Sequence, residues 1–295
     1  MWMQLKLAWK NIFRNKRRTI IAGIAIGIGL GSLIFTDALI TGMKQNMVRS
    51  ATDSFLGEAQ IHRKGFRDTY EVERTVANSE EVLRRLRRDT LVEHVTPRVM
   101  SLAMLSSPSD VSAVTMVGIE PSTEQHLSQI DEALTRGDYF AEETERALLI
   151  GNDLAELLQV ELDDRVVLTV SEAGTGNLAQ EMFRVSGIFH FNVDEMDKAM
   201  AFVRISRARD MLGLQKAVHE IALTFTDPSI ARQNGHPFWD RYSAGGNEAV
   251  GWPELVPQLE AALEMSEFST YLVGIILFSV VALGIINTLF MWLHE

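Results

Sequence analysis

Two uninterrupted apolar stretches dominate the pattern of hydrophobic and polar positions along the chain. Residues 19–36 contain no charged side chain, and residues 268–293 form a second uncharged stretch of 26 residues. At about 1.5 Å of rise per residue, 18 helical residues span about 27 Å, close to the hydrocarbon core of a bilayer. We therefore predict transmembrane helices at residues 19–40 and 268–293, with a separate domain between them at residues 41–267.

The first apolar stretch also has features of a cleavable secretory signal. A basic cluster precedes it, and Thr36-Asp37-Ala38 resembles a cleavage site. The apolar region of a signal peptide is usually only about 7–15 residues long, and here a second apolar span follows. We therefore favour an uncleaved anchor, and a secreted binding domain with a cleaved signal is the alternative.

Residues 1–18 predict an amphipathic helix that lies in the inner headgroup layer. Apolar and aromatic residues share one face of the helical wheel, and basic residues at i, i+4 spacing share another. The alternative is the basic start of a long signal peptide. The predicted membrane-interface residues are Trp2, Lys6, Trp9, Lys10, Arg14, Arg17 and Arg18.

Charge is distributed unevenly along the chain. Residues 1–18 carry six basic side chains and no acidic one, whereas residues 41–267 carry 37 acidic and 22 basic side chains. Basic segments stay on the cytoplasmic side of a membrane, so residues 41–267 are predicted to lie outside, in the periplasm of a cell with an inner membrane. The acidic domain argues against binding to nucleic acid. The chain has no cysteine, which excludes disulfides, thiolate metal sites and a cysteine nucleophile.

Three features of the spans suggest contacts inside the membrane. Gly23, Gly27 and Gly31 are spaced four residues apart on one helix face, which allows another helix to approach closely. Asp37 is the one acid at the outer edge of the first span, where it could contact substrate or helix or simply face water. Asn287 in the second span could hydrogen-bond to a neighbouring helix. We predict that these residues form helix contacts or line a lipid-accessible cavity, although each also has an ordinary structural explanation.

The domain between the spans has the pattern of an α+β fold. The first span is predicted to continue as a helix beyond the membrane, and a second helix runs from about residue 257 into the membrane. Ser79, Ser206 and a Ser122–Gln125 capping box are predicted to begin helices. Residues 233–252 are rich in Gly, Pro and aromatic residues and predict a loop. The predicted strands lie at residues 59–66, 114–119, 147–151, 163–170, 183–189, 199–205 and 219–225.

No constellation of residues predicts a catalytic site, a cofactor site or a metal site. The chain has no phosphate-binding G-x-x-x-x-G-K-[ST] loop and no G-x-S-x-G nucleophile elbow. The sequence HEIAL at 219–223 lacks the second histidine of a zinc protease and fits a strand. His190, Asp194, Glu195 and Asp197 are close in sequence, but an acidic surface loop explains them more simply than a metal. We therefore expect no enzymatic activity in this chain.

Several segments in a fixed order resemble the MacB/FtsX-type permeases of ABC transporters, and most closely the branch with the lipoprotein-releasing (Lol) permeases. They are LAWKNIFRNKRRTIIAGIAIGIG, VTPRVMSLAML, VGIEPSTE, LTRGDYF, LLIGNDLAELLQVELDDRVVLTV, FRVSGIF and VVALGIINTLFM. The resemblance implies a periplasmic core with a Porter-like and a Sabre-like subdomain, the latter in the strand-rich part at about 136–218.

The same resemblance implies partners. It implies an ATPase supplied as a separate subunit, a second permease subunit in a homo- or heterodimer, contact with membrane lipid, and a lipoprotein or another envelope molecule as substrate. Family members have four spans, so the chain corresponds to the N-terminal portion of the pattern, with the last two spans absent. A two-span sensor with a periplasmic ligand-binding domain has the same topology and is the alternative function.

Overall fold

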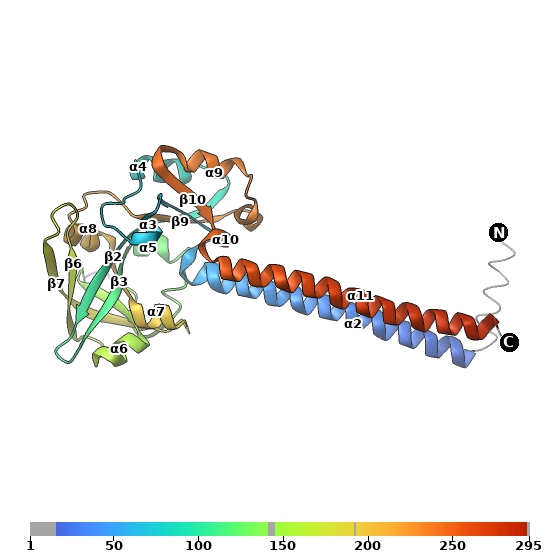
Figure 1. Ribbon diagram of the computed structural model, residues 1–295. Coiled ribbons are helices and arrows are strands. Elements are labelled where there is room, and N and C mark those ends of the chain that lie inside the picture. The colour runs from blue at the N-terminus through green and yellow to red at the C-terminus, as the bar shows by residue number, and fades with distance from the viewer. Residues whose placement is uncertain (1–15, 141–144, 192, 294–295) are drawn as a thin grey trace. The chain divides into compact units, whose positions relative to one another are not determined.

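The computed structural model describes residues 16–140, 145–191 and 193–293, which fall into two compact units (Figure 1). The first unit comprises the chain up to Val48 and from Pro257 onward, and it consists of two long helices. The second unit, Arg49–Val256, is a mixed α/β domain. Two apolar helices thus flank an α+β domain, as the sequence predicts.

The helices agree with the periodicity of the sequence at the two ends of the chain, where continuous helices were predicted. The α-helices are α2 (Lys16–Ala51), α3 (Phe66–Thr69), α4 (Ser79–Leu86), α5 (Pro121–Glu124), α6 (Asn152–Leu158), α7 (Asp194–Ala199), α8 (Ile205–Leu212), α9 (Pro237–Tyr242), α10 (Trp252–Leu255) and α11 (Pro257–Leu293). Three tighter or wider turns are the π-helical η1 (Thr52–Leu56) and the 3₁₀-helical η2 (Pro228–Arg232) and η3 (Ala244–Gly246).

The strands include every segment that alternation and β-branched residues predict, and three more. They are β1 (Ala59–Arg63), β2 (Val92–Ser106), β3 (Val111–Ile119), β4 (Leu134–Gly137), β5 (Ala147–Gly151), β6 (Arg165–Ser171), β7 (Leu178–Phe189), β8 (Met200–Arg204), β9 (Glu220–Phe225) and β10 (Asn247–Gly251). The unpredicted strands are β2, β4 and β10.

Some local predictions are wrong. Neither Ser79 nor Ser206 caps a helix, because each already lies inside one: the N-cap positions are Asn78 and Arg204. The N-cap of α5 is Glu120, so the predicted capping box does not form. Residues 233–252 are not a loop, since they contain α9, η3 and β10. The segment after β7 is not a surface loop either, because it forms α7 and buries Asp197.

Six of the strands close into a ring. Pairing runs from β2 to β3, β8, β5, β7 and β6, and then returns to β2. Closure leaves no free edge among these strands, which removes a site of unwanted strand pairing. The six strands of the ring all lie between Val92 and Arg204 in the sequence. The predicted division into subdomains, with a strand-rich part at about 136–218, stays a prediction.

The two faces of the ring are covered by different elements. On the inner face, α8 packs so closely that a Cβ on Gly118 would lie 2.4 Å from the Cβ of Ala208, so only glycine fits there. On part of the outer face, Phe55 from η1 packs edge-on against Phe202 of β8 at 5.5 Å between ring centroids. The turn that directly follows α2 is therefore embedded in the core of the second unit.

Strand β2 is shared between the ring and an open arm of the sheet. The arm runs β10–β1–β9–β2, with the first half of β2 paired to β9. The register places four ionisable residues in one row across these strands: Glu248, His62, Glu220 and Arg98. Directly opposed residues of neighbouring strands lie on the same face, so the row forms one polar line across the arm.

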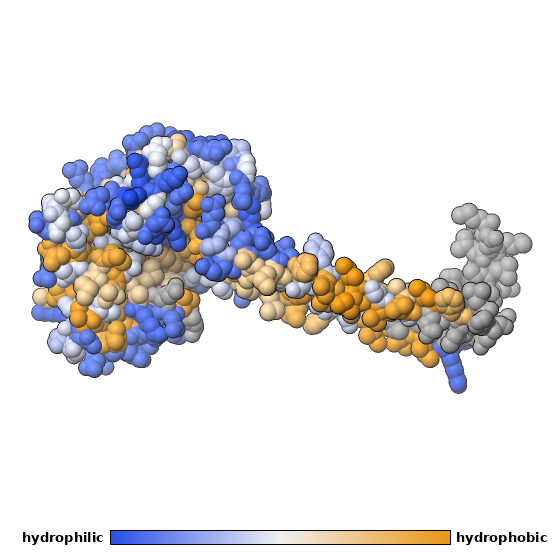
Figure 2. All heavy atoms as spheres, in the orientation of Figure 1, coloured by the Kyte–Doolittle hydropathy of each residue, from blue (hydrophilic) through white to orange (hydrophobic). Residues whose placement is uncertain are grey.

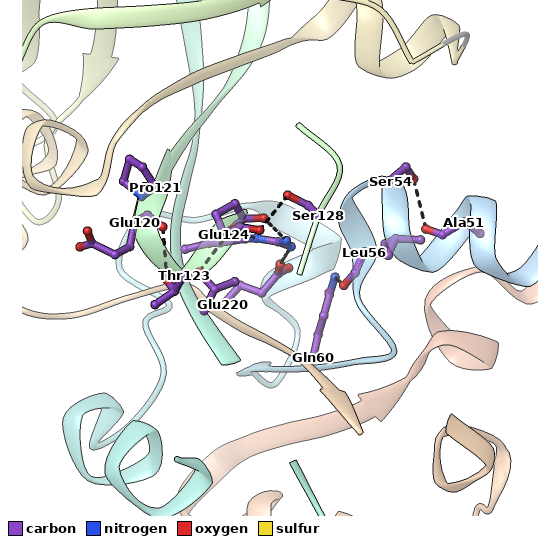
Figure 3. A network of polar contacts seen from close by, with 12 residues as sticks. Ala51, Ser54, Leu56, Gln60, Glu120, Pro121, Thr123, Glu124, Ser128 and Glu220 are labelled. Carbon is purple, nitrogen blue, oxygen red and sulfur yellow. Dashed lines mark hydrogen bonds and ion pairs between the residues drawn. The ribbon is translucent and has the colours of Figure 1, made fainter. Parts of the chain in front are cut away.

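Arg98 ends this row in a fully buried ion cluster with Glu124 and Glu220, the two residues of the cluster that Figure 3 labels. Its guanidinium donates to both carboxylate oxygens of Glu124, at 2.5 and 3.1 Å, and to Oε1 of Glu220 at 2.9 Å. The ring of Phe55 lies over the guanidinium, with 3.8 Å between its centroid and the guanidinium carbon. Burial opposes the charged form, but the charges of Glu124 and Glu220 outweigh it and raise the pKa of Arg98.

His219 is held as a neutral ring directly before β9. The backbone N–H of Met100 donates to Nδ1 at 3.0 Å, so Nε2 carries the proton and donates to the carbonyl of Val72 at 2.8 Å. The ring stacks on Phe66 with 5.0 Å between centroids. Burial lowers the pKa of His219, although the hydrogen bond to Val72 opposes the shift.

Replacing Arg98 with methionine is expected to destabilise the second unit by about 3–5 kcal/mol, because it leaves Glu124 and Glu220 buried without their counter-charge. The free energy of unfolding is measured by urea titration, followed by tryptophan fluorescence. The matched control is Arg165→Met, at an exposed position of β6, which should change the stability by less than about 0.5 kcal/mol. Equal stabilities of the two variants would show that the cluster contributes nothing.

The lowered pKa of His219 predicts that the domain loses stability in mild acid. Below the unfolded value of about 6.5, the unfolded chain binds a proton that the folded chain does not, so stability falls as pH falls, by at most about 1.4 kcal/mol per pH unit. Urea titrations at a series of pH values from 7.5 downward measure this slope. His219→Gln should be less stable at neutral pH but have a shallower slope; an unchanged slope would assign the acid sensitivity to other groups.

Candidate functional site

The two long helices of the first unit present apolar side chains that the described chain does not cover. The segments Ile26–Leu56 and Pro257–Gly284 are long and apolar enough to cross a membrane, and their most apolar stretches have no buried residues. Phe35 and Phe278, for example, are 70% and 71% exposed. Figure 2 shows this apolar surface along both helices. Exposed apolar surface of this extent is the property of a membrane-embedded segment.

A groove lies between α2 and α11. One ion pair shows how the two helices are aligned along their length. Nζ of Lys44 is 3.9 Å from Oε1 of Glu267, near the end of α2 and the start of α11. Asp37 and Gly274 each lie seven residues deeper, about 10 Å further along antiparallel helices, so they face each other. The groove has a volume of about 550 Å³. It is lined by Leu33, Ile34, Thr36, Asp37, Ile40, Thr270, Tyr271, Val273, Gly274, Ile275, Leu277 and Phe278.

Among the described residues that line the groove, Asp37 alone carries a charge. Its side chain is exposed, and in the part of the chain that the structure describes it has no hydrogen bond or ion pair. The nearby hydroxyl of Thr270 donates to the carbonyl of Ser266 at 2.8 Å and is therefore engaged within its own helix. The groove thus combines an apolar body with one carboxylate that is free to accept hydrogen bonds.

The predicted glycine stripe does not face this groove. A Cβ added to Gly23, Gly27 or Gly31 would meet no described atom within 4 Å, and none of the three residues lines the groove. The stripe is therefore not the surface on which α2 meets α11. That another helix packs against this stripe stays a prediction.

Most of the other residues that were predicted to contact the membrane lie outside the described part of the chain. Arg17 is exposed in the first turn of α2. The remaining candidates lie outside the described residues, either entirely or through their side chains, and the interfacial helix at residues 1–18 stays a prediction. They are Trp2, Lys6, Trp9, Lys10 and Arg14, and the side chains of Arg18 and Asn287.

The segment that raised the question of a metal has a structural role instead. The carboxylate of Asp197 accepts a hydrogen bond from the backbone N–H of Phe191 at 2.8 Å and lies 3.0 Å from Nδ1 of His190. Within residues 16–140, 145–191 and 193–293, no three His, Asp or Glu side chains are arranged to hold a metal ion. Asp197 fixes the turn between β7 and α7.

Sequence reasoning missed a second apolar surface, on the outer face of the strand ring. Leu102 and Met104 of β2 and Leu178 of β7 are 62%, 45% and 72% exposed, and they border a shallow groove of about 550 Å³. The alternation of β2 carries the signal, because large apolar side chains occupy both of its faces. Patches of this kind mark contact surfaces of soluble domains.

Comparison with known proteins connects these features to a family. The sequence model of the MacB-like periplasmic core domain matches residues 19–233, which is well over half of the chain. The periplasmic region of MacB from Actinobacillus actinomycetemcomitans is a similar solved structure, with 12% identity and a TM-score of 0.46 over 68% of this chain and 92% of that one.

Two curated relatives are transmembrane proteins of lipoprotein-releasing systems. LolC of the lipoprotein-releasing system from Neisseria meningitidis serogroup B is 26% identical over 221 residues, covering 72% of this chain and 49% of LolC. LolE from Haemophilus influenzae is 23% identical over 236 residues, covering 77% of this chain and 56% of LolE. The chain therefore spans about half the length of the curated relatives it matches. With its ordered motifs, its α/β domain between two apolar helices and the match over residues 19–233, the chain belongs to the family of proteins with a MacB-like periplasmic core domain.

Proposed function

We propose that this chain is a permease subunit, in its N-terminal half, of a type VII ABC transporter. The observation that carries the proposal is the family match over residues 19–233, which begins in one apolar helix and covers most of the α/β domain. Such a permease couples ATP hydrolysis in the cytoplasm to work in the periplasm. It carries out no chemistry itself, so its residues bind, position and move.

The proposed work is the release of lipoproteins from the inner membrane. Support comes from the relatives LolC and LolE, both named as transmembrane proteins of a lipoprotein-releasing system. The groove between α2 and α11 suits this role, because it presents apolar side chains at the depth of the acyl chains of a membrane lipid. The proposed partners are an ATPase subunit, a second permease subunit and membrane lipid.

The proposed orientation follows from charge. Lys16 and Arg17 stand at the start of α2, after a segment with three basic side chains and no acidic one, whereas the α/β domain is acidic. The positive-inside rule then puts the N-terminus in the cytoplasm and residues 41–267 in the periplasm. Helices α2 and α11 cross the inner membrane between these two compartments.

A two-span sensor is the second candidate function. It rests on the same topology and on the apolar groove of the strand ring, which offers a place for a ligand in the outer domain. A sensor would pass its signal to a cytoplasmic module without an ATPase. Binding of an ATPase therefore separates the two functions.

The orientation is testable with single cysteines, because the chain has none of its own. Thr175→Cys, at the exposed turn between β6 and β7, should react with a membrane-impermeant maleimide in intact spheroplasts. Arg17→Cys should react only after lysis, because the bilayer shields the cytoplasmic side. Labelling of Arg17→Cys in intact spheroplasts, or protection of Thr175→Cys, would reverse the topology.

The transport function predicts a stable complex with an ATPase. The protein should co-purify with a separately encoded ATPase subunit, and the complex in nanodiscs should release a bound lipoprotein when ATP is added. A complex with a Walker-B variant of the ATPase, which binds ATP without hydrolysing it, is the control and should not turn over. An isolated full-length protein that binds no ATPase would favour the sensor.

A further inference from the structure

We propose that a small polar pocket of the α/β domain binds a free α-amino acid, with its ammonium on the acidic side of the pocket and its carboxylate on Arg67. The pocket has a volume of about 210 Å³, and its lining comes from β1, α3, β10 and α10. All of its residues belong to the second unit, so the inference does not depend on the release of lipoproteins. The polar side chains of the lining are His62, Arg67, Asp68, Glu248 and Glu254.

His62 supplies a buried acceptor that the described chain does not use. Its side chain is 3% exposed, and Nε2 has no hydrogen-bond partner among the described residues. Nδ1 lies 3.4 Å from the carbonyl oxygen of Arg63 and 3.8 Å from Oε2 of Glu248. Both neighbours are acceptors, so the neutral ring carries its proton on Nδ1 and has a free lone pair at Nε2. A buried acceptor without a partner costs free energy, and a ligand N–H group in the pocket would supply the missing donor.

Three carboxylates make the lining acidic. Asp68 and Glu254 are exposed and form no ion pair with any described residue, and the nearest cationic group to Glu248 is the ring of His62. The only guanidinium among the described lining residues is that of Arg67, so three negative charges face one positive charge. A pocket with this balance favours a cation that can also donate hydrogen bonds.

A primary ammonium fits these acceptors better than a metal ion. Among the residues that the structure describes, no three His, Asp or Glu side chains are arranged to hold a metal. A metal site requires ligand distances within about 0.2 Å of fixed values. An ammonium tolerates looser geometry, and its three N–H groups can be shared between Nε2 of His62 and the carboxylates.

Arg67 provides a place for a carboxylate in the same pocket. One nitrogen of its guanidinium donates to Oε1 of Gln60 at 2.7 Å, which orients the side chain, and Arg67 has no ion pair with any described residue. A guanidinium has five N–H donors in a geometry that matches a carboxylate. An ammonium and a carboxylate on one small molecule are the defining groups of a free amino acid.

The size of the pocket agrees with this class of ligand. Each water molecule takes about 30 Å³ of liquid volume, so 210 Å³ corresponds to about seven waters. A small amino acid has a similar number of non-hydrogen atoms, whereas a peptide has many more. The pocket is therefore suited to a single small amino acid.

The test is calorimetric titration of the full chain in nanodiscs with glycine, alanine and serine. Alaninamide, which lacks the carboxylate, and lactate, which lacks the ammonium, are titrated for comparison. Three substitutions each remove one part of the site, and the same exchange outside the pocket is the control. The pairs are Glu254→Gln with Glu161→Gln, His62→Phe with His126→Phe, and Arg67→Met with Arg165→Met.

We expect at least one of the three amino acids to bind and lactate not to bind. E254Q and H62F should each weaken the binding of that amino acid about tenfold, because each removes an acceptor for the ammonium. R67M should weaken the amino acid about tenfold without affecting alaninamide, and the three control variants should change neither affinity. Circular dichroism checks the folding of every variant, and E254Q keeps the test valid if H62F does not fold, because Glu254 is exposed.

Three outcomes would overturn the inference while leaving the proposed transport function intact. The first is that none of the three amino acids binds to the wild-type protein. The second is that E254Q and its control E161Q have equal affinities, which would place the binding site elsewhere. The third is that alaninamide binds as tightly as alanine and R67M changes neither, because the pocket would then take a lone ammonium and not an amino acid.

Discussion

The structure depends on one constraint: α2 and α11 carry apolar surface that the described chain cannot bury. Such surface is stable only in hydrocarbon, where no water is available for unpaired backbone groups, so both segments must be continuous helices. Polar side chains within them satisfy themselves locally. Ser279, for instance, donates its hydroxyl to the carbonyl of Ile275, one turn earlier, at 2.7 Å. A charge at the edge of this environment, such as Asp37, needs either water or a partner of opposite charge.

The α/β domain must satisfy a second requirement. Its first segment, which follows α2 in the chain, must lie next to its last segment, which precedes α11. The backbone meets that requirement directly, since the carbonyl of Glu58 after η1 accepts a hydrogen bond from the N–H of Trp252 in α10 at 2.9 Å. Phe55 and Trp252 are both buried, so each end of the domain has an aromatic anchor. Each ring also contacts a guanidinium: that of Arg98 lies over Phe55, and that of Arg232 lies over Trp252.

Sequence reasoning succeeded where a signal is local and failed where it depends on distant partners. The long helices and β3, β5 and β9 follow from uninterrupted periodicity within a few residues of chain. The ring and the Arg98 cluster could not be predicted, because Glu124 and Glu220 lie 26 and 122 residues from Arg98 in sequence. The missed helix caps have a simpler cause. Ser79 and Ser206 have the right chemistry, but the N-cap position lies one residue before Ser79 and two residues before Ser206.

The two candidate surfaces of α2 point in different directions, and this limits what they can bind. At 3.6 residues per turn, the stripe of Gly23, Gly27 and Gly31 is centred about 110° around the helix from the groove residues of α2, which are Leu33, Ile34, Thr36, Asp37 and Ile40. A helix that packed on the stripe would therefore leave the groove to α11 and its ligand. In the proposed permease, that arrangement lets a second subunit contact α2 without occupying the substrate groove, so subunit assembly and substrate binding use separate faces of one helix.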